Sequence, residues 1–182
     1  QLKNFEKSLN EEKISMDKNL SSQIKIKKNE LNKLNIKLNF NNNFSLLENL
    51  KNLNKQLDQA KVKNIIQNKN KIIDSKFDSI IFRQQVLTDL PPKELRAIVD
   101  QGKKEIKAGI IMACCIHEGK IGVAIGITDK LVDKFDAVKL VKEAAKILGG
   151  KGGGGRRDFA QAGGINKNKI EEAFKALSKK IN

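Results

Sequence analysis

The stretch GGKGGGGRRDFAQAGG, residues 149–164, is the most informative part of this sequence. Eight of its sixteen residues are glycine, and it holds two of the four arginines in the chain. Glycine has no Cβ and tolerates positive φ, so a glycine run lets backbone N–H groups approach a phosphate closely. Lysine and arginine next to the run supply positive charge, and arginine can hold a phosphate through two hydrogen bonds. The candidate anion-binding residues of this stretch are Lys151, Gly152, Gly153, Gly154, Gly155, Arg156, Arg157 and Gln161.

A flexible linker is the alternative interpretation of such a glycine run. Two features favour an ordered loop that contacts phosphate: the paired arginines, and the segment FAQA at 159–162, which is expected to pack against the rest of the domain. The segment is not a Walker A loop, because Lys151 precedes the glycines and no Ser or Thr follows them. It is not a dinucleotide fingerprint either, since it follows a predicted helix rather than a strand.

Residues 76–182 alternate strand and helix patterns, which predicts a small α/β domain with a mixed sheet. Apolar runs predict strands around 80–87, 109–116 and 121–127, the last two joined by a turn at 118–120. Asp136 is expected to cap a helix that ends at Gly149. The residues expected on buried helix faces are Leu95, Ile98, Val99, Val138, Val141, Ala145, Leu148, Ile170, Phe174, Leu177 and Ile181.

Residues 1–75 contain no Gly, Pro or Arg, and this change of composition predicts a domain boundary near residue 75. Leucine-rich stripes over 20–38 and 46–60 flank an asparagine-rich break at 39–43. The spacing predicts an antiparallel helical hairpin that resembles a coiled coil and packs on itself. Dimerisation through apolar positions left over, such as Leu47, Ile65 and Ile66, is a possible addition.

Composition limits the classes of function. The chain has 182 residues, 39% of them hydrophobic, and no apolar run approaches the roughly 20 residues of a membrane span. It opens on Gln1, and we expect it to be a piece of a longer protein. The net charge of +15 suits a polyanion, although heavy use of Lys, Asn and Ile is also typical of an A+T-rich genome. With one histidine, His117, and the adjacent Cys114 and Cys115, a zinc site is not expected, and all three are interpreted as strand residues.

The segment 141–164 resembles the end of alanyl-tRNA synthetase. The string VKEAAKIL at 141–148 is followed by GGKGGG, arginine, Asp158 and FAQAGG, as in that family's C-terminal (C-Ala) domain of the DHH-associated type. The resemblance covers about residues 77–182, and the preceding hairpin matches the family's helical subdomain. Two departures are a fourth Gly after Lys151 and Arg157 in place of the usual Pro.

The resemblance implies a cytoplasmic tRNA-binding module that docks the outer corner of the L-shaped tRNA(Ala). In the family this module helps to couple aminoacylation with editing of mischarged tRNA. The full-length enzyme would be an ATP-dependent alanine–tRNA ligase, with ATP, Mg²⁺ and Zn²⁺ used by domains outside this chain. The implied partners are tRNA(Ala), other domains of the same enzyme and a second copy of the chain. The fragment itself is expected to have no catalytic centre and no cofactor.

Several further residues have two interpretations. Lys139, Lys142 and Lys146 lie on one helix face, either as a solvated surface or as a track for the tRNA backbone. The cluster of Lys103, Lys104 and Lys107 is interpreted as a complement to a helix dipole. Asp158 is expected to hold Arg156 or cap a turn, and Gln161 to contact RNA or the protein's own backbone. With Phe as the only aromatic residue type, recognition of folded RNA by shape and phosphate is favoured over base stacking.

Two rival hypotheses remain. The chain is alternatively the nucleic-acid-binding accessory domain of a DHH phosphoesterase of the RecJ type, or an oligomerisation module without a ligand. An upstream zinc editing motif would support the synthetase, and a DHH metal motif the phosphoesterase.

Overall fold

The computed structural model describes residues 15–27, 29–30, 46–67 and 72–182. The chain divides into two compact units, Gln1–Lys61 and Val62–Asn182. The predicted boundary near residue 75 stays a prediction, and the first strand of the sheet begins before it, at Ile72. No helix in the described ranges is long and apolar enough to cross a membrane.

The first unit contains helical residues 15–27 and 29–30 and most of helix α2 (Leu46–Gln67). Its core confirms the leucine stripe where it can be followed, because Ile24 packs with Leu50, Leu53, Leu57 and Ala60. The predicted turn at 39–43 and the stripe positions Leu31, Leu34 and Leu38 lie outside the described residues.

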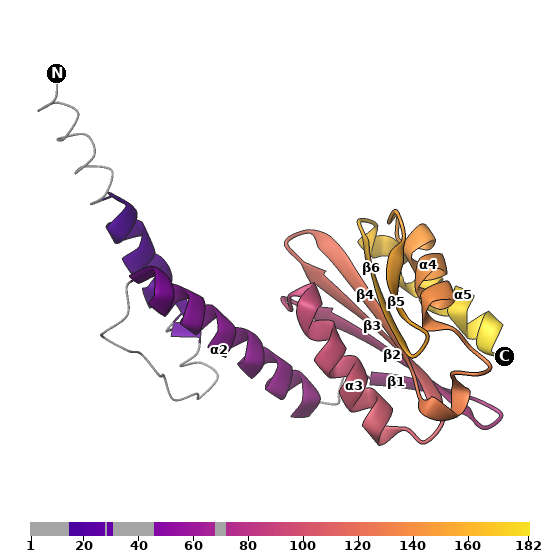
Figure 1. The fold of residues 1–182 in the computed structure, drawn as a ribbon. Helices are drawn as coiled ribbons and strands as arrows, with labels where there is room; N and C mark the ends of the chain where they lie inside the picture. The colour runs from indigo at the N-terminus through magenta and orange to yellow at the C-terminus, as the bar shows by residue number, and fades with distance from the viewer. Residues whose placement is uncertain (1–14, 28, 31–45, 68–71) are drawn as a thin grey trace, which may run out of the picture. The chain divides into compact units, whose positions relative to one another are not determined.

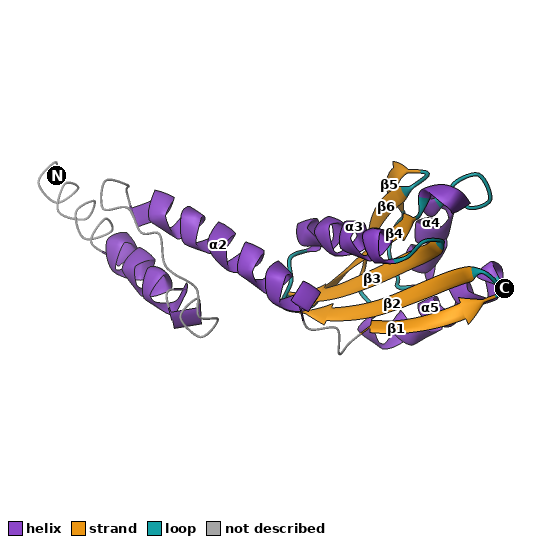
Figure 2. Ribbon diagram, turned by 90° about the horizontal axis from the view of Figure 1, so that it is seen from below, coloured by secondary structure: helices purple, strands orange, loops and turns teal. Residues whose placement is uncertain are grey.

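The second unit is built on a six-stranded mixed sheet with the order β1-β2-β3-β4-β6-β5. Neighbouring strands are antiparallel except β2 and β3, which are parallel. Strands β1 and β5 form the two opposite edges of the sheet (Figure 2). The strands are β1 (Ile72–Phe77), β2 (Ile80–Thr88), β3 (Gly109–His117), β4 (Lys120–Ile127), β5 (Gly153–Arg156) and β6 (Phe159–Gly164). The helices are α3 (Leu95–Glu105), α4 (Ala137–Ile147) and α5 (Ile170–Ile181), with 3₁₀ turns at Pro92–Glu94, Asp129–Leu131 and Lys167–Lys169.

The sheet has a hydrophobic core on each face. Helix α3 covers one face, and α4 and α5 cover the other (Figure 1). Side chains of β3 alternate between the cores, so Cys114 faces α4 and α5 whereas Cys115 faces α3. This confirms that the adjacent cysteines point to opposite faces. Burial, together with the neighbouring Cys115, raises the pKa of Cys114 to about 12, so this thiol stays protonated at neutral pH.

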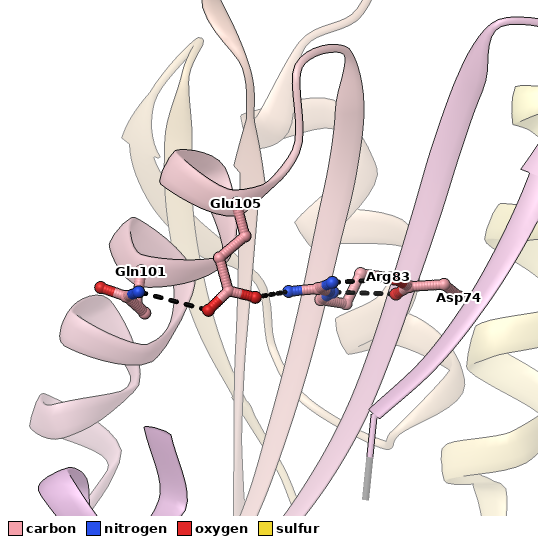
Figure 3. Close-up of polar contacts among 4 residues, drawn as sticks. All are labelled: Asp74, Arg83, Gln101 and Glu105. Atoms are coloured by element: carbon pink, nitrogen blue, oxygen red, sulfur yellow. Dashed lines mark hydrogen bonds and ion pairs between the residues drawn. The ribbon is translucent and has the colours of Figure 1, made fainter. Parts of the chain in front are cut away.

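An ion network fastens β1 to the rest of the sheet. The Arg83 guanidinium on β2 donates from Nε and Nη2 to the two Asp74 carboxylate oxygens, both at 2.8 Å, and from Nη1 to Glu105 at 2.7 Å. Gln101 donates to the second oxygen of Glu105 at 3.2 Å (Figure 3). Because Arg83 is only 9% exposed, this network joins β1, β2 and the end of α3 from within the structure.

The predicted mixed sheet with covering helices is confirmed, as are the strands β2, β3 and β4. The residues predicted to lie on buried helix faces are all buried except Val138, which is half-buried against the core. Strands β1, β5 and β6 were not predicted. Ile65 and Ile66, expected to be left over for dimerisation, instead pack against the α3-side core, whereas Leu47 is half exposed.

Candidate nucleic-acid interface

The glycine run forms an edge strand, not the predicted loop. Residues Gly153–Arg156 make strand β5, which pairs only with β6, in the register Gly154 opposite Gln161 and Arg156 opposite Phe159. Glycine has a low intrinsic propensity for β-strands. Here the backbone of the neighbouring strand in the sheet supplies the hydrogen-bonding partner. An edge strand also leaves part of its backbone hydrogen-bonding groups turned away from the sheet.

Helix α4 holds the β5–β6 hairpin at both of its ends and lies beside it (Figure 1). At the start of α4, the Ala137 N–H donates to the Arg157 carbonyl at 2.9 Å, and the Asp136 side chain accepts from Val138 N–H as predicted. At its end, Gly149 adopts a φ of +74°, which favours glycine and closes a Schellman turn. These contacts fix the hairpin relative to the exposed face of α4.

Further contacts complete the C-terminal attachment. Gly150 N–H donates to the Ala145 carbonyl at 2.7 Å, and Gly149 N–H donates to Lys146 at 3.2 Å. The N–H groups of Ile165 and Asn166 both donate to the Leu148 carbonyl at 2.9 Å. The chain that enters β5 and the chain that leaves β6 are therefore tied to the same helix end.

Most glycines of the run are needed for packing. A Cβ on Gly150 would overlap the Gly163 carbonyl, and one on Gly153 or Gly155 would overlap the β6 backbone. Gly152 has open space around it but a φ of +127° that favours glycine. Gly154 differs, because nothing lies within 4 Å of its would-be Cβ and its φ is not positive. The fold alone therefore gives no reason for glycine at 154, whereas close approach of a ligand to the main chain would.

The predicted cations of the hairpin are exposed. The side chains of Arg156 and Arg157 are 69% and 62% exposed, and Lys151 is exposed as well. Arg157 makes a long ion pair with Asp136, at 4.0 Å. Lys139, Lys142 and Lys146 are exposed along α4, the helix that holds the hairpin. The structure thus brings all of these predicted cations to the hairpin or to α4.

Asp158 and Gln161 have structural partners, as one interpretation of each predicted. Asp158 pairs with Arg156 Nε at 3.1 Å, and Gln161 Nε2 donates to the Pro92 carbonyl at 3.3 Å. Asp158 also accepts from Lys103 Nζ at 3.2 Å. Partial burial alone would raise the pKa of Asp158, but the hydrogen bond and charge of Lys103 and the charge of Arg156 hold it below its usual value.

Sequence reasoning missed the contacts that support the hairpin from the α3 side. Arg96 lies over the Phe159 ring at 4.9 Å, and Lys103 reaches Asp158, 55 residues away in the chain. Both contacts join residues far apart in sequence, so local patterns held no signal for them. No group of three or more potential metal-ligating side chains occurs within the described part of the chain.

Comparison with known proteins identifies the class. Residues 79–182 match the DHHA1 domain model, and because this is more than half of the chain, the chain belongs to the DHHA1 domain family. The chain is also similar to the alanine–tRNA ligases of Hyphomonas neptunium, 53% identical over 85 residues, and Parvibaculum lavamentivorans, 45% identical over 92. These alignments cover 47% and 50% of this chain but only 10% of each ligase.

A solved structure agrees with these relatives. The C-Ala domain of Aquifex aeolicus alanyl-tRNA synthetase has a TM-score of 0.56 and 31% identity, and the match covers 59% of this chain and 96% of that one. The resemblance to the C-terminal domain of alanyl-tRNA synthetase is therefore confirmed. That both relatives are ligases favours this interpretation over the phosphoesterase alternative.

Proposed function

We propose that this chain is the tRNA-binding C-terminal domain of an alanine–tRNA ligase. The observation that supports the proposal most is the open main chain at Gly154, on an edge strand flanked by the exposed cations Lys151, Arg156 and Arg157. Positive side chains and backbone N–H groups bind RNA through its phosphates, without reading sequence. The ligase relatives and the C-Ala match favour tRNA as the polyanion.

The proposal extends to the whole enzyme. We infer that it is an ATP-dependent ligase acting in the cytoplasm, and that this domain docks the elbow of tRNA(Ala) and helps to couple aminoacylation with editing of mischarged tRNA. Comparing intact tRNA(Ala) with a minihelix of its acceptor arm tests the elbow, because the minihelix lacks that corner. We expect the minihelix to bind at least tenfold more weakly, and equal affinities would contradict elbow docking.

The direct test of the site removes two hairpin cations, Lys151→Ala with Arg156→Ala. Fluorescence anisotropy with labelled tRNA(Ala) should show about tenfold weaker binding at low salt and a shallower dependence of log K on log salt, since each lost phosphate contact lowers that slope by about one. A matched control is Lys175→Ala with Lys179→Ala, two exposed lysines on α5. An unchanged isotherm for the hairpin variant would refute the site.

A second variant, Gly154→Ala, tests the main chain rather than the charge. The added methyl meets no protein atom within 4 Å, so we expect the free energy of unfolding to stay within about 0.5 kcal/mol of wild type. If RNA phosphate packs against this backbone, the same methyl should weaken tRNA binding several-fold. A folded variant with full affinity would show that the ligand does not approach Gly154.

Self-association is a separate part of the proposal. With Ile65 and Ile66 partly buried against the α3-side core, Leu47, which is 50% exposed, is the most accessible of the three named positions for contact with a second copy. Sedimentation of the wild type and of Leu47→Lys, with and without tRNA, tests the homodimer. A dimer lost in the variant would support it, and a wild-type monomer at all concentrations would contradict it.

A further inference from the structure

A groove of about 540 Å³ lies at the end of α3, on the sheet face opposite to α4. Its walls come from α3, from the segment leading into β3 and from the 3₁₀ turn after β4. The residues that line it are Asp100, Lys103, Lys104, Ile106, Lys107, Thr128, Asp129 and Lys130. Thr128 Oγ1 accepts from Gly109 N–H at 2.9 Å and donates to the Gly109 carbonyl at 3.2 Å, which fixes the turn that presents Lys130.

The groove has an uncompensated positive charge. Lys103 is paired with Asp158, and Asp100 is paired with Arg96 at 3.7 Å. The other charged residues of the groove are three lysines, Lys104, Lys107 and Lys130, and one carboxylate, Asp129. Within the described part of the chain, none of the three lysines forms an ion pair with a carboxylate. Three exposed lysines against one aspartate give the groove a net positive charge, and this charge favours an anionic ligand.

The dipole of α3 does not account for this arrangement. A helix C-terminus favours cations within its last turn, which explains Lys103 and Lys104. Lys107 lies beyond the helix end, and Lys130 comes from a different element. The interpretation of Lys103, Lys104 and Lys107 as a dipole complement therefore covers only part of the groove.

The groove is joined to the β5–β6 hairpin through Asp158. The two oxygens of this carboxylate pair with Lys103 from the groove at 3.2 Å and with Arg156 from the hairpin at 3.1 Å. Its backbone carbonyl accepts from the N–H of Ile127 at 2.9 Å, two residues before the 3₁₀ turn begins at Asp129. Asp158 therefore contacts one hairpin cation, Arg156, and one groove lysine, Lys103, and so links the two groups of residues.

We propose that this groove binds the phosphate backbone of the same RNA, through Lys104, Lys107 and Lys130. This inference rests on the proposed function and adds a second contact to it. A phosphodiester chain is the occupant that the charges favour, because lysines bind phosphate oxygens as point charges and none of the residues that line the groove offers an aromatic ring for a base to stack on. The RNA then extends from the hairpin turn toward α3.

The test is a triple variant of the full chain, Lys104→Ala with Lys107→Ala and Lys130→Ala. The control triple, Lys63→Ala with Lys175→Ala and Lys179→Ala, lowers the net charge equally at exposed positions elsewhere. Anisotropy with labelled tRNA(Ala) across a salt series should show about tenfold weaker binding for the groove triple and a slope lowered by about two to three, against little change for the control. Replacing the same three lysines by arginine should restore binding, which separates charge from structural damage.

The outcomes separate this proposal from the proposed function. If the Lys151 and Arg156 variant loses tRNA affinity and the groove triple keeps it, the groove proposal is overturned and the hairpin site stands. If the two triples lose affinity equally, net charge alone explains the effect and the groove proposal is again overturned. The proposal would also be overturned if the wild type bound inorganic phosphate in the groove but the groove triple variant kept full affinity for tRNA. If the wild-type chain does not bind tRNA at all, the proposed function itself fails.

Discussion

The two edges of the sheet are built by opposite means. At the β1 edge, the buried Arg83 forms hydrogen-bonded ion pairs with both Asp74 and Glu105, so its charge is neutralised within the protein. At the β5 edge, the strand is held by main-chain bonds and by glycines that allow close packing, while its cations remain exposed. The difference separates charge that stabilises the fold from charge that is available to a ligand.

The Arg83→Ala variant gives the largest expected effect on this comparison. It removes the buried guanidinium that Asp74 and Glu105 share, and we expect the free energy of unfolding to fall by about 2–3 kcal/mol. Urea unfolding measures this loss, with Arg83→Lys as the control that keeps charge without the two-pronged geometry and restores only part of the stability. At a temperature where Arg83→Ala is folded, its tRNA affinity should equal that of wild type. A stable variant that had lost tRNA binding would reverse the roles of the two edges.

Gly150→Ala tests whether the β5 edge depends on close packing. The new methyl would overlap the Gly163 carbonyl, so the chain must shift, and we expect a cost of about 2 kcal/mol in urea unfolding. Gly154→Ala, one strand residue with open space around it, is the matched control with almost no cost. Equal stabilities for the two variants would show that the glycines of this edge are not there for packing.

The smallest expected effect is the pH dependence at Asp158. Its pKa is lowered in the folded state, so its ionised form stabilises the fold above the ordinary aspartate pKa of about 3.9 and ceases to do so as the pH falls through the lowered value. Asp158→Asn should cost less than about 1 kcal/mol at pH 7, because the pair is partly exposed. The difference between variant and wild type should shrink as the pH falls below about 4. A difference that persisted there would indicate a cause other than charge.

Local patterns predicted much of the sheet and its covering helices. Apolar runs located β2, β3 and β4, and the capping residue Asp136 and the terminal Gly149 marked the ends of α4. Strand β5 could not be predicted, because three of its four residues are glycine and its stability comes from β6 and α4. Strand propensity depends on the side chain of each residue, and in this strand only Arg156 has a side chain.

The candidate site was predicted in its residues rather than in its shape. The cations and glycines of 151–157 were singled out from the sequence, but the role of each glycine depends on a backbone contact made only after folding. The groove was missed because Lys130 joins Lys104 and Lys107 through the pairing of β3 with β4. Lysines that are scattered in sequence become neighbours only when the sheet forms.

The two adjacent cysteines can be used to measure the opening of each layer of the domain. Cys114 and Cys115 are fully buried on the central strand β3, one in each core, and both pKa values are raised by burial. A thiol-modifying reagent can therefore reach Cys115 only when the α3 layer separates from the sheet, and Cys114 only when the α4 and α5 layer does. The order in which single-cysteine versions are labelled would reveal which layer detaches first, and whether bound RNA delays it.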